Sequence, residues 1–164
     1  MDGRVNGRGR EPPAKAKIRP ARAADIDALL AIENAVFASD RIERRAFRHA
    51  IRSPTMICLV ASERSKVLGY GIVERRRTST AARLTSVAVA PEAAGAGLGQ
   101  RLLTGLETEA IAAGARRMRL EVRADNRIAR KLYEMAGYRL VETIEDYYED
   151  GGAALRYEKA LASR

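Results

Sequence analysis

Residues 84–103 read Leu84-Thr-Ser-Val-Ala-Val-Ala-Pro-Glu-Ala-Ala-Gly-Ala-Gly-Leu-Gly-Gln-Arg-Leu-Leu103. Valines alternate with small residues in the first third of this segment, which favours a β-strand. Pro91 ends the strand, because proline has no N–H to donate to a neighbouring strand. After the glycines, leucines recur at helical spacing, at Leu98, Leu102, Leu103 and Leu106. The segment therefore predicts a strand, a glycine-rich turn and a helix in immediate succession.

The three glycines of this segment lie where the predicted helix begins. Gly95, Gly97 and Gly99 remove Cβ atoms at the point where the first helical N–H groups have no partner within the helix. The helix dipole adds about half a positive charge at this end, so the site suits a phosphate or pyrophosphate. Glycine also punctuates ordinary turns, and the glycines alone leave a simple tight turn open.

The length and composition indicate one globular domain. The 164 residues are enough for one core and too few for two, and an apolar content of 46% argues against global disorder. No apolar run approaches the roughly 18 residues that would span a bilayer. The arginines near the N-terminus are not followed by the apolar core of a secretory signal. We therefore expect a soluble, cytoplasmic protein with no membrane partner.

The charge balance is basic, and the metal-ligating residues are few. Lys and Arg outnumber Asp and Glu by 30 to 21, for a net charge of +9. This excess could steer an anionic cofactor, an acidic protein surface or nucleic acid, or it could be ordinary solvated charge. Cys58 is the only cysteine and His49 the only histidine. A disulfide framework and a Cys/His metal site are therefore excluded, and we predict no metal.

The remaining sequence divides into a tail and a series of short elements. Residues 1–16 are rich in Gly, Arg, Pro and Lys, which predicts a flexible basic tail ahead of a single domain over residues 17–164. Asp40-Arg-Ile-Glu43 has capping-box spacing and predicts the start of a second helix. The other predicted elements are a strand over 16–20, a helix from Asp25, strands over 56–61 and 67–75, a strand over 116–123, a helix over 126–136, and strands over 138–144 and 153–159. The order is β-α-α-β-β-β-α-β-α-β-β, an α/β fold with a mixed, mostly antiparallel sheet flanked by helices.

Two later segments strengthen the interpretation of the glycine turn. These are Leu120-Glu-Val-Arg-Ala-Asp-Asn126 and Lys131-Leu-Tyr-Glu-Met-Ala-Gly-Tyr138. Together with the first segment, they resemble the acetyl-CoA-binding core of the GNAT N-acetyltransferase family, and most closely its ribosomal-protein-alanine (RimI-like) branch. The resemblance is specific from about residue 84 to 138 and weaker from about 17 to 161. It implies the GNAT fold, with which the predicted order of elements agrees.

The resemblance implies acetyl-CoA as the co-substrate, bound mainly through the backbone. In the family, the motif strand and the next strand splay apart around the pantetheine arm. The residues that would pair with the pantetheine amides and polarise the thioester carbonyl are Val87, Ala88 and Val89. The residues whose N–H groups would hold the pyrophosphate are Gly95, Ala96, Gly97, Leu98, Gly99 and Gln100. Asn126 would contact the cofactor and can also cap its helix.

The glycine turn departs from the family pattern Gln/Arg-x-x-Gly-x-Gly/Ala. Its first position is Ala94, and the neighbouring position, often basic in the family, is Gly95. Two side-chain contacts to phosphate are thus absent, so we expect backbone binding. A Rossmann dinucleotide site fits less well, because the glycines read G-x-G-x-G rather than G-x-G-x-x-G and antiparallel strands are predicted before them. Glu121 does lie about twenty residues further on, where such a site would place its ribose-binding acid.

The resemblance also assigns the catalytic residues. Glu121 matches the general base of the RimI-like branch, and Tyr133 matches the proton donor to the CoA sulfur. From the residues alone, Glu121 could instead be a strand residue paired with Arg119 or Arg123, and Tyr133 could be part of the core. No Ser or Cys nucleophile with a base partner is visible in the sequence. Direct transfer in a ternary complex is therefore favoured over a ping-pong mechanism.

The acceptor is the least determined part of this interpretation. The resemblance implies that residues 37–43 and the final hairpin line a peptide groove. Tyr147 and Tyr148 resemble the aromatic pair of the branch, whereas residues 37–43 lack the tryptophan of close relatives. The acidic residues of the hairpin could receive a cationic N-terminus or a lysine, or could be solvated in a turn: Asp146, Glu149 and Asp150.

We therefore expect a monomer or homodimer that acetylates a primary amine, namely a protein N-terminal α-amine or a lysine. Two other functions stay open. One is acetyl transfer to a small-molecule amine such as a polyamine, an amino acid or a drug. The other is a non-catalytic CoA-sensing or nucleic-acid-binding module, whose nucleic-acid binding would weaken steeply with salt. Nucleic acid is not the expected partner.

Overall fold

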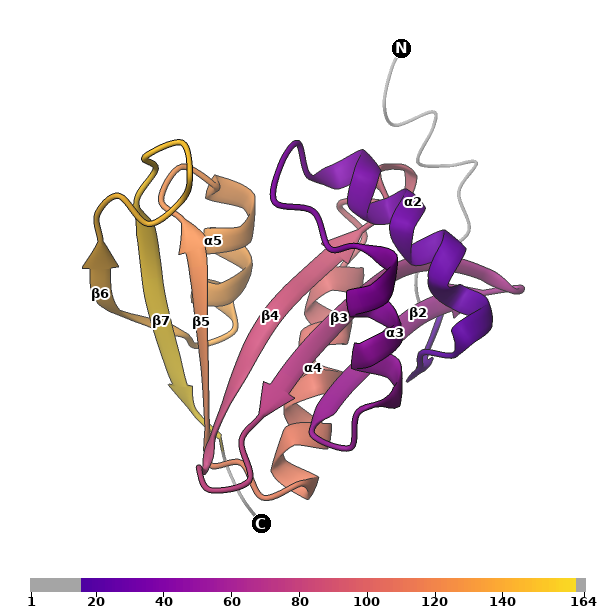
Figure 1. The fold of residues 1–164 in the computed structure, drawn as a ribbon, viewed down its shortest axis with the longest axis horizontal. Helices are drawn as coiled ribbons and strands as arrows, with labels where there is room; N and C mark the ends of the chain where they lie inside the picture. Colours follow the sequence, from indigo (N-terminus) through magenta and orange to yellow (C-terminus); the bar gives the residue numbers. More distant parts are fainter. Residues whose placement is uncertain (1–15, 162–164) are drawn as a thin grey trace.

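A computed structural model describes residues 16–161 as a seven-stranded sheet with helices on both faces (Figure 1). The predicted tail lies outside these residues apart from Ala16. The strands are β1 (Lys17–Pro20), β2 (Met56–Glu63), β3 (Lys66–Arg75), β4 (Ala81–Val89), β5 (Arg117–Arg123), β6 (Arg139–Ile144) and β7 (Ala154–Ala160). The helices are α2 (Ile26–Val36), α3 (Arg44–Arg52), α4 (Leu98–Ala112) and α5 (Arg127–Met135), with 3-10 turns η2 (Ala23–Asp25) and η3 (Pro91–Ala93). This arrangement confirms the predicted fold class and order.

The strand order is β1-β2-β3-β4-β5-β7-β6, and β4 and β5 are the parallel neighbours. They pair only where Ala81–Arg83 faces Arg117–Arg119. Past this point the two strands diverge, and Figure 1 shows the opening between them. Among the described residues, β5 leaves the facing edge of β4 unpaired from Leu84 to Val89. That edge has free backbone groups to offer to a bound molecule.

A β-bulge lies next to the divergence. Val73 of β3 pairs with Leu84, but its neighbour Ile72 pairs with Ser86, so Thr85 is an extra residue in β4. An extra residue shifts the alternation of side chains between the two faces of a strand. Leu84 accordingly packs in the core beneath α4, whereas Ser86 hydrogen-bonds to Tyr70 in the core beneath α2 and α3.

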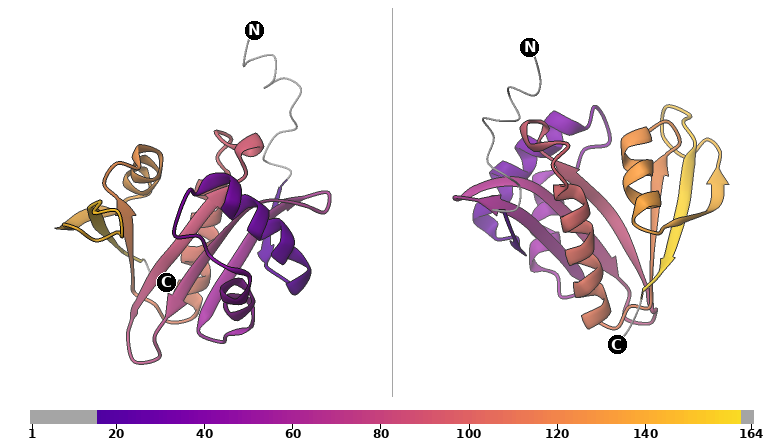
Figure 2. Two further views of the ribbon diagram at one scale, coloured as in Figure 1. Left: turned by 45° about the horizontal axis from the view of Figure 1, so that its top comes forward. Right: turned by 180° about the vertical axis from the view of Figure 1, so that it is seen from behind.

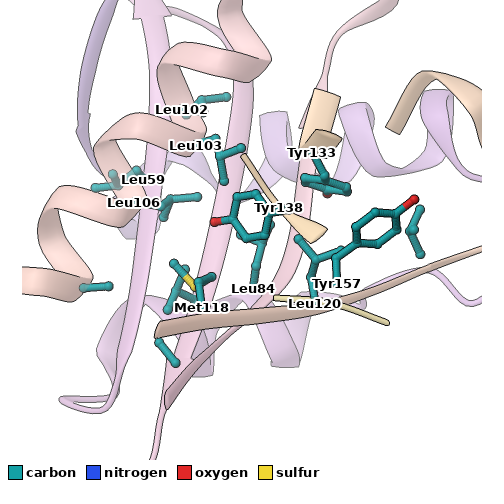
Figure 3. Packing of buried hydrophobic residues seen from close by; sticks show 14 of the residues in the cluster. Leu59, Leu84, Leu102, Leu103, Leu106, Met118, Leu120, Tyr133, Tyr138 and Tyr157 are labelled. Carbon is teal, nitrogen blue, oxygen red and sulfur yellow. The ribbon is translucent and has the colours of Figure 1, made fainter. Parts of the chain in front are cut away.

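Each face of the sheet has its own hydrophobic core. Helices α4 and α5 cover one face, as the view from behind in Figure 2 shows. There the predicted leucines of α4 pack against strand residues such as Leu84, Met118 and Leu120 (Figure 3). The other core joins α2 and α3 to β2 and β3 through side chains such as Leu29, Phe47 and Tyr70. Together the two cores fix the positions of β4 and β5.

Two local predictions were wrong. The capping box at residues 40–43 does not form: α3 begins at Arg44, Glu43 makes no side-chain cap, and Asp40 has a left-handed φ of 53°. The strands predicted over 56–61 and 67–75 are longer, at Met56–Glu63 and Lys66–Arg75, because Arg64 and Ser65 with φ of 52° and 70° form a two-residue hairpin turn. Paired φ values of this sign are typical of the tightest hairpin turns.

Candidate active site

The glycine turn leads into α4, whose first N–H groups have no acceptor within the helix. Gly95 and Gly97 have left-handed φ values of 80° and 85°, which glycine adopts without strain. The first helical hydrogen bond of α4 runs from the Arg101 N–H to the Gly97 carbonyl (3.1 Å), so the three preceding N–H groups have no helical acceptor. A Cβ added at Gly95 or Gly97 would meet nothing within 4 Å. This open turn fits an anionic group such as a pyrophosphate.

Gly99 has a different role from the other two glycines. It is already helical, and a Cβ there would lie 3.6 Å from Leu132 of α5. That distance is an ordinary van der Waals contact, so Gly99 lies at the contact between α4 and α5, while the turn itself is made by Gly95 and Gly97.

A cleft of about 640 Å³ opens where β4 and β5 diverge. It is lined by β4, β5, α5, the α2–α3 loop and the β6–β7 loop. Four of the predicted site residues line it together: Val87, Glu121, Asn126 and Tyr133. Ala88 is buried in the core beneath α2, Val89 packs on the α4 side, and residues 95–100 lie outside the cleft lining. The divergence thus gathers the residues from the later two motifs, with the glycine turn beyond the end of β4.

Glu121 is held by two arginines. Its side chain is 5% exposed; Oε1 accepts from Arg83 (Nη2–Oε1 2.9 Å) and Oε2 from Arg156 (Nε–Oε2 2.8 Å). The alternative partners expected from the sequence were wrong, since Arg119 pairs with Glu158 and Arg123 with Asp150. Because strands β4 and β7 supply the two arginines, the carboxylate is fixed from both sides of β5.

Tyr133 differs from its buried tyrosine neighbours. The hydroxyl of Tyr138 donates to Glu107 (2.7 Å) and that of Tyr157 to Glu134 (2.6 Å), whereas the Tyr133 hydroxyl has no hydrogen-bond partner within residues 16–161. Burial raises the pKa of Tyr133 above its ordinary value, and the proximity of Tyr148 adds to the shift. The phenol therefore stays protonated and is available to a bound molecule in the cleft.

Asn126 begins α5 as predicted. Its Oδ1 accepts the Ala129 N–H (3.1 Å), which satisfies one of the free N–H groups of the helix. The cap leaves the amide nitrogen of the side chain available on the wall of the cleft.

The final hairpin closes the far side of the cleft. Tyr148 lines it, with the Arg123 guanidinium 4.6 Å from its ring centroid and Tyr147 packed edge-on. Of the three acidic hairpin residues singled out in the sequence, only Asp150 lines the cleft, and it pairs with Arg123 (2.6 Å). Of the aromatic pair, Tyr148 therefore lines the cleft, and Tyr147 packs against it from outside the lining.

The lining is acidic although the protein is basic. Among the lining residues Arg123 is the one basic side chain, against five carboxylates: Glu33, Asp40, Glu121, Asp125 and Asp150. Counting also Arg83 and Arg156, which pair with Glu121 from outside the lining, five carboxylates face three guanidinium groups, so the cleft is net acidic in a chain with a net charge of +9.

Glu33 was missed by the sequence analysis. It is 2% exposed, accepts the Ile42 N–H (2.8 Å) and accepts a hydrogen bond from the Tyr70 hydroxyl. The available signal was its spacing, because Glu33 follows Ile26 and Leu29 on the apolar face of α2. A carboxylate on an apolar helix face needs a specific partner or a function.

Within residues 16–161, no helix is long and apolar enough to cross a membrane. The same residues hold no group of three or more His, Cys, Asp or Glu side chains arranged for a metal ion.

Comparisons with known proteins identify the family of the chain. The acetyltransferase (GNAT) family model matches residues 26–138, which contain the glycine turn, Glu121 and Tyr133. A Bacillus subtilis protein provisionally named ribosomal protein bS18-alanine N-acetyltransferase is 31% identical over 139 residues, covering 84% of this chain and 90% of that protein.

Solved acetyltransferase structures share the fold of this chain. The ribosomal-protein-S18-alanine N-acetyltransferase of Escherichia coli superposes with a TM-score of 0.80 at 25% identity, covering 91% of this chain and 96% of that one. An acetyltransferase fold from Salmonella typhimurium, solved with its cofactor acetyl-CoA, has a TM-score of 0.77 at 23% identity, with coverages of 92% and 96%. The chain belongs to the GNAT family and is an acetyl-CoA-dependent N-acetyltransferase.

Proposed function

We propose that this enzyme acetylates the α-amine of a protein or peptide N-terminus by direct attack in a ternary complex. The observation that carries the proposal is the cleft at the β4–β5 divergence, which combines Glu121 and Tyr133 with an acidic lining. A lysine side chain is the next acceptor by the same chemistry, since it too is a primary amine with a positive charge.

Acetyl-CoA would be held chiefly by the backbone. The N–H groups of residues 95–100 would bind the pyrophosphate, and the unpaired edge of Val87, Ala88 and Val89 would pair with the pantetheine amides. Asn126 would contact the cofactor from the start of α5. When bound, acetyl-CoA supplies the acetyl group as an activated thioester, and an N–H group of β4 would polarise its carbonyl.

The side chains of the cleft would handle the protons. Glu121 would accept the proton that the nitrogen loses as the C–N bond forms, directly or through a water molecule. The buried phenol of Tyr133 would donate a proton to the sulfur as the C–S bond breaks. Removing either function would slow the chemical step without preventing substrate binding.

The acidic lining supports a cationic acceptor, and the relatives support a peptide. The Escherichia coli relative above is named as an alanine N-acetyltransferase of a ribosomal protein, and the Bacillus subtilis relative carries the same name provisionally. The α2–α3 loop and the β6–β7 loop both line the cleft, where they would contact a chain that extends beyond the reacting amine.

An acceptor panel tests the proposal. The purified enzyme is incubated with acetyl-CoA and one of three acceptors: a lysine-free peptide that begins with alanine, the same peptide blocked at its α-amine and carrying one lysine, or a polyamine. Mass spectrometry should show an acetyl group on the first peptide with the highest kcat/KM. Faster acetylation of the polyamine would contradict the peptide acceptor, and faster acetylation of the blocked peptide would move the assignment to lysine.

A further inference from the structure

Three oxygen-bearing side chains run from the cleft into the core beneath α2. Ser86 lines the cleft just after the β4 bulge, and its Oγ lies 3.2 Å from the hydroxyl of Tyr70. The fully buried Tyr70 donates in turn to Oε1 of Glu33. A hydrogen-bonded chain thus connects Ser86 to Glu33, a buried carboxylate that itself borders the cleft.

Glu33 is distinguished by what surrounds it. Its oxygens accept from two neutral donors, the Tyr70 hydroxyl and the Ile42 N–H, and no described residue forms an ion pair with it. Glu121, by contrast, is neutralised by Arg83 and Arg156. The two carboxylates therefore differ in their partners, and Glu33 is the one that hydrogen bonds link to Ser86 through Tyr70.

The proposed reaction must dispose of two protons. An acceptor enters as an ammonium group with three N–H bonds and leaves as an amide with one. One of these two protons is balanced by the sulfur, which leaves as a thiol after it accepts a proton from Tyr133. The other proton must leave before the nitrogen can attack, since an ammonium group has no lone pair.

We propose that Ser86, Tyr70 and Glu33 form the relay that takes the first proton from the acceptor ammonium. The ammonium donates to Ser86 Oγ, the Ser86 proton passes to Tyr70, and the Tyr70 proton passes to Glu33. The products of the step are a neutral amine and a protonated Glu33, and the hydroxyls of Ser86 and Tyr70 are restored. The reversed relay returns the proton to solvent after the acetylated product leaves.

In this relay Ser86 is the member that touches the acceptor, and Tyr70 and Glu33 act through it. Burial, and then the neighbouring Glu33, raise the pKa of Tyr70, so the phenol can pass a proton on without remaining ionised. The relay rests on the proposed amine acetylation, and it adds a proton acceptor on the opposite side of β4 from Tyr133.

The fold contains tyrosine–carboxylate pairs that serve as structural controls. Glu107, the partner of Tyr138, also binds Lys159 Nζ (3.0 Å). The pair of Tyr157 and Glu134 faces Arg130. A cation therefore accompanies each of these pairs, and neither residue of the Tyr157–Glu134 pair lines the cleft. Tyr157→Phe removes the same kind of bond as Tyr70→Phe at a place outside the relay.

The test compares acceptors that differ only in whether a proton must be removed. Two otherwise identical peptides begin with alanine or with trifluoroalanine, whose amine is neutral at the assay pH because fluorine withdraws electrons. Tyr70→Phe should lower kcat about a hundredfold with the alanine peptide. The loss with the trifluoroalanine peptide should be at most about threefold, because that amine needs no relay. KM for acetyl-CoA should not change.

Two results would overturn the relay. An equal loss of kcat with both peptides would show that the Tyr70 hydroxyl is only structural and would overturn the relay, as would the same acceptor dependence in Tyr157→Phe. Ser86→Ala and Glu33→Gln should reproduce the Tyr70→Phe pattern, and the triple variant should be no slower than the slowest single one. Absence of peptide acetylation by the wild-type enzyme would instead contradict the proposed function.

Discussion

The cleft holds two buried carboxylates in opposite electrostatic settings. Glu121, between β4 and β7, has an arginine on each oxygen, whereas Glu33, beneath α2, has neutral donors only. In the proposed mechanism the two carboxylates take different protons: Glu121, held in place by its arginines, accepts the proton released as the C–N bond forms, and Glu33 accepts the first proton of the ammonium through Tyr70 and Ser86. Tyr133 complements both, because its hydroxyl has no partner among the described residues and can donate.

The largest expected effect concerns the donor. Tyr133→Phe should lower kcat by about a hundredfold or more, since a positioned general acid contributes on that scale. The KM values for both substrates should stay near those of the wild type. The melting temperature should change little, because no hydrogen bond within residues 16–161 is lost. Steady-state kinetics gives kcat and KM, and thermal unfolding gives the melting temperature. An unchanged kcat would remove Tyr133 from the mechanism.

The glycine turn should affect binding rather than chemistry. Gly97→Ala places a side chain at φ 85°, which costs about 1–2 kcal/mol of stability and should disturb the N–H groups of residues 95–100. We expect the acetyl-CoA Kd to rise about tenfold, which is about 1.4 kcal/mol. Gly114→Ala is the matched control, with φ 100° and open space at the other end of α4. Calorimetric titration should find equal affinities in the control and the wild type; parallel weakening in both variants would count against the turn as a pyrophosphate site.

The two carboxylates should also differ in what they contribute to stability. Glu121→Gln leaves the Arg83 and Arg156 guanidinium groups without their charged partner and should destabilise the fold by about 1 kcal/mol after allowance for solvent screening. Glu33→Gln leaves no cation without a partner, and the new amide can hydrogen-bond to Tyr70 and Ile42. Its loss of unfolding free energy should therefore be smaller. Urea unfolding measures the free energy of unfolding of both variants. A larger decrease for Glu33→Gln than for Glu121→Gln would contradict this prediction.

The smallest effect is expected at an ion pair outside the cleft. Arg19 binds Asp25 through two hydrogen bonds of 2.9 Å and lowers the pKa of that carboxyl. A lowered folded-state pKa adds stability above the unfolded pKa of about 3.9, and this stability is lost as the pH falls through the folded value. Asp25→Asn should therefore cost up to about 1 kcal/mol at pH 7, and the difference from the wild type should shrink as the pH falls through the lowered pKa of Asp25. Its kcat should be unchanged, and a gap that persists in acid would contradict the ion-pair assignment.

Local and periodic signals explain which features the sequence predicted. The leucine spacing predicted α4, and the glycines predicted the turn before it. The alternation of Met118, Leu120 and Val122 predicted β5. The predicted start of the second helix was wrong. The capping-box pattern at residues 40–43 is short, and Asp40 adopts a left-handed φ that does not form the cap. Short motifs of this kind are easily outweighed by tertiary context.

The site required long-range information that the sequence does not carry. The residue types of Glu121 and Tyr133 pointed to their roles only through resemblance, and the partners of Glu121 come from β4 and β7, 38 and 35 residues away. The bulge at Thr85 directs Ser86 toward Tyr70, and nothing in the local sequence marks it. Glu33 was detectable as a carboxylate on an apolar helix face, but its partners were not.

The most direct test of the account is a crystal structure of the enzyme with a bisubstrate analogue in which coenzyme A is joined to a peptide α-amine. The account predicts the diphosphate on the N–H groups of residues 95–100, the pantetheine arm along the free edge of β4, and the peptide nitrogen in the cleft between Ser86 and Glu121. A diphosphate bound elsewhere, or a peptide nitrogen outside the cleft, would contradict it.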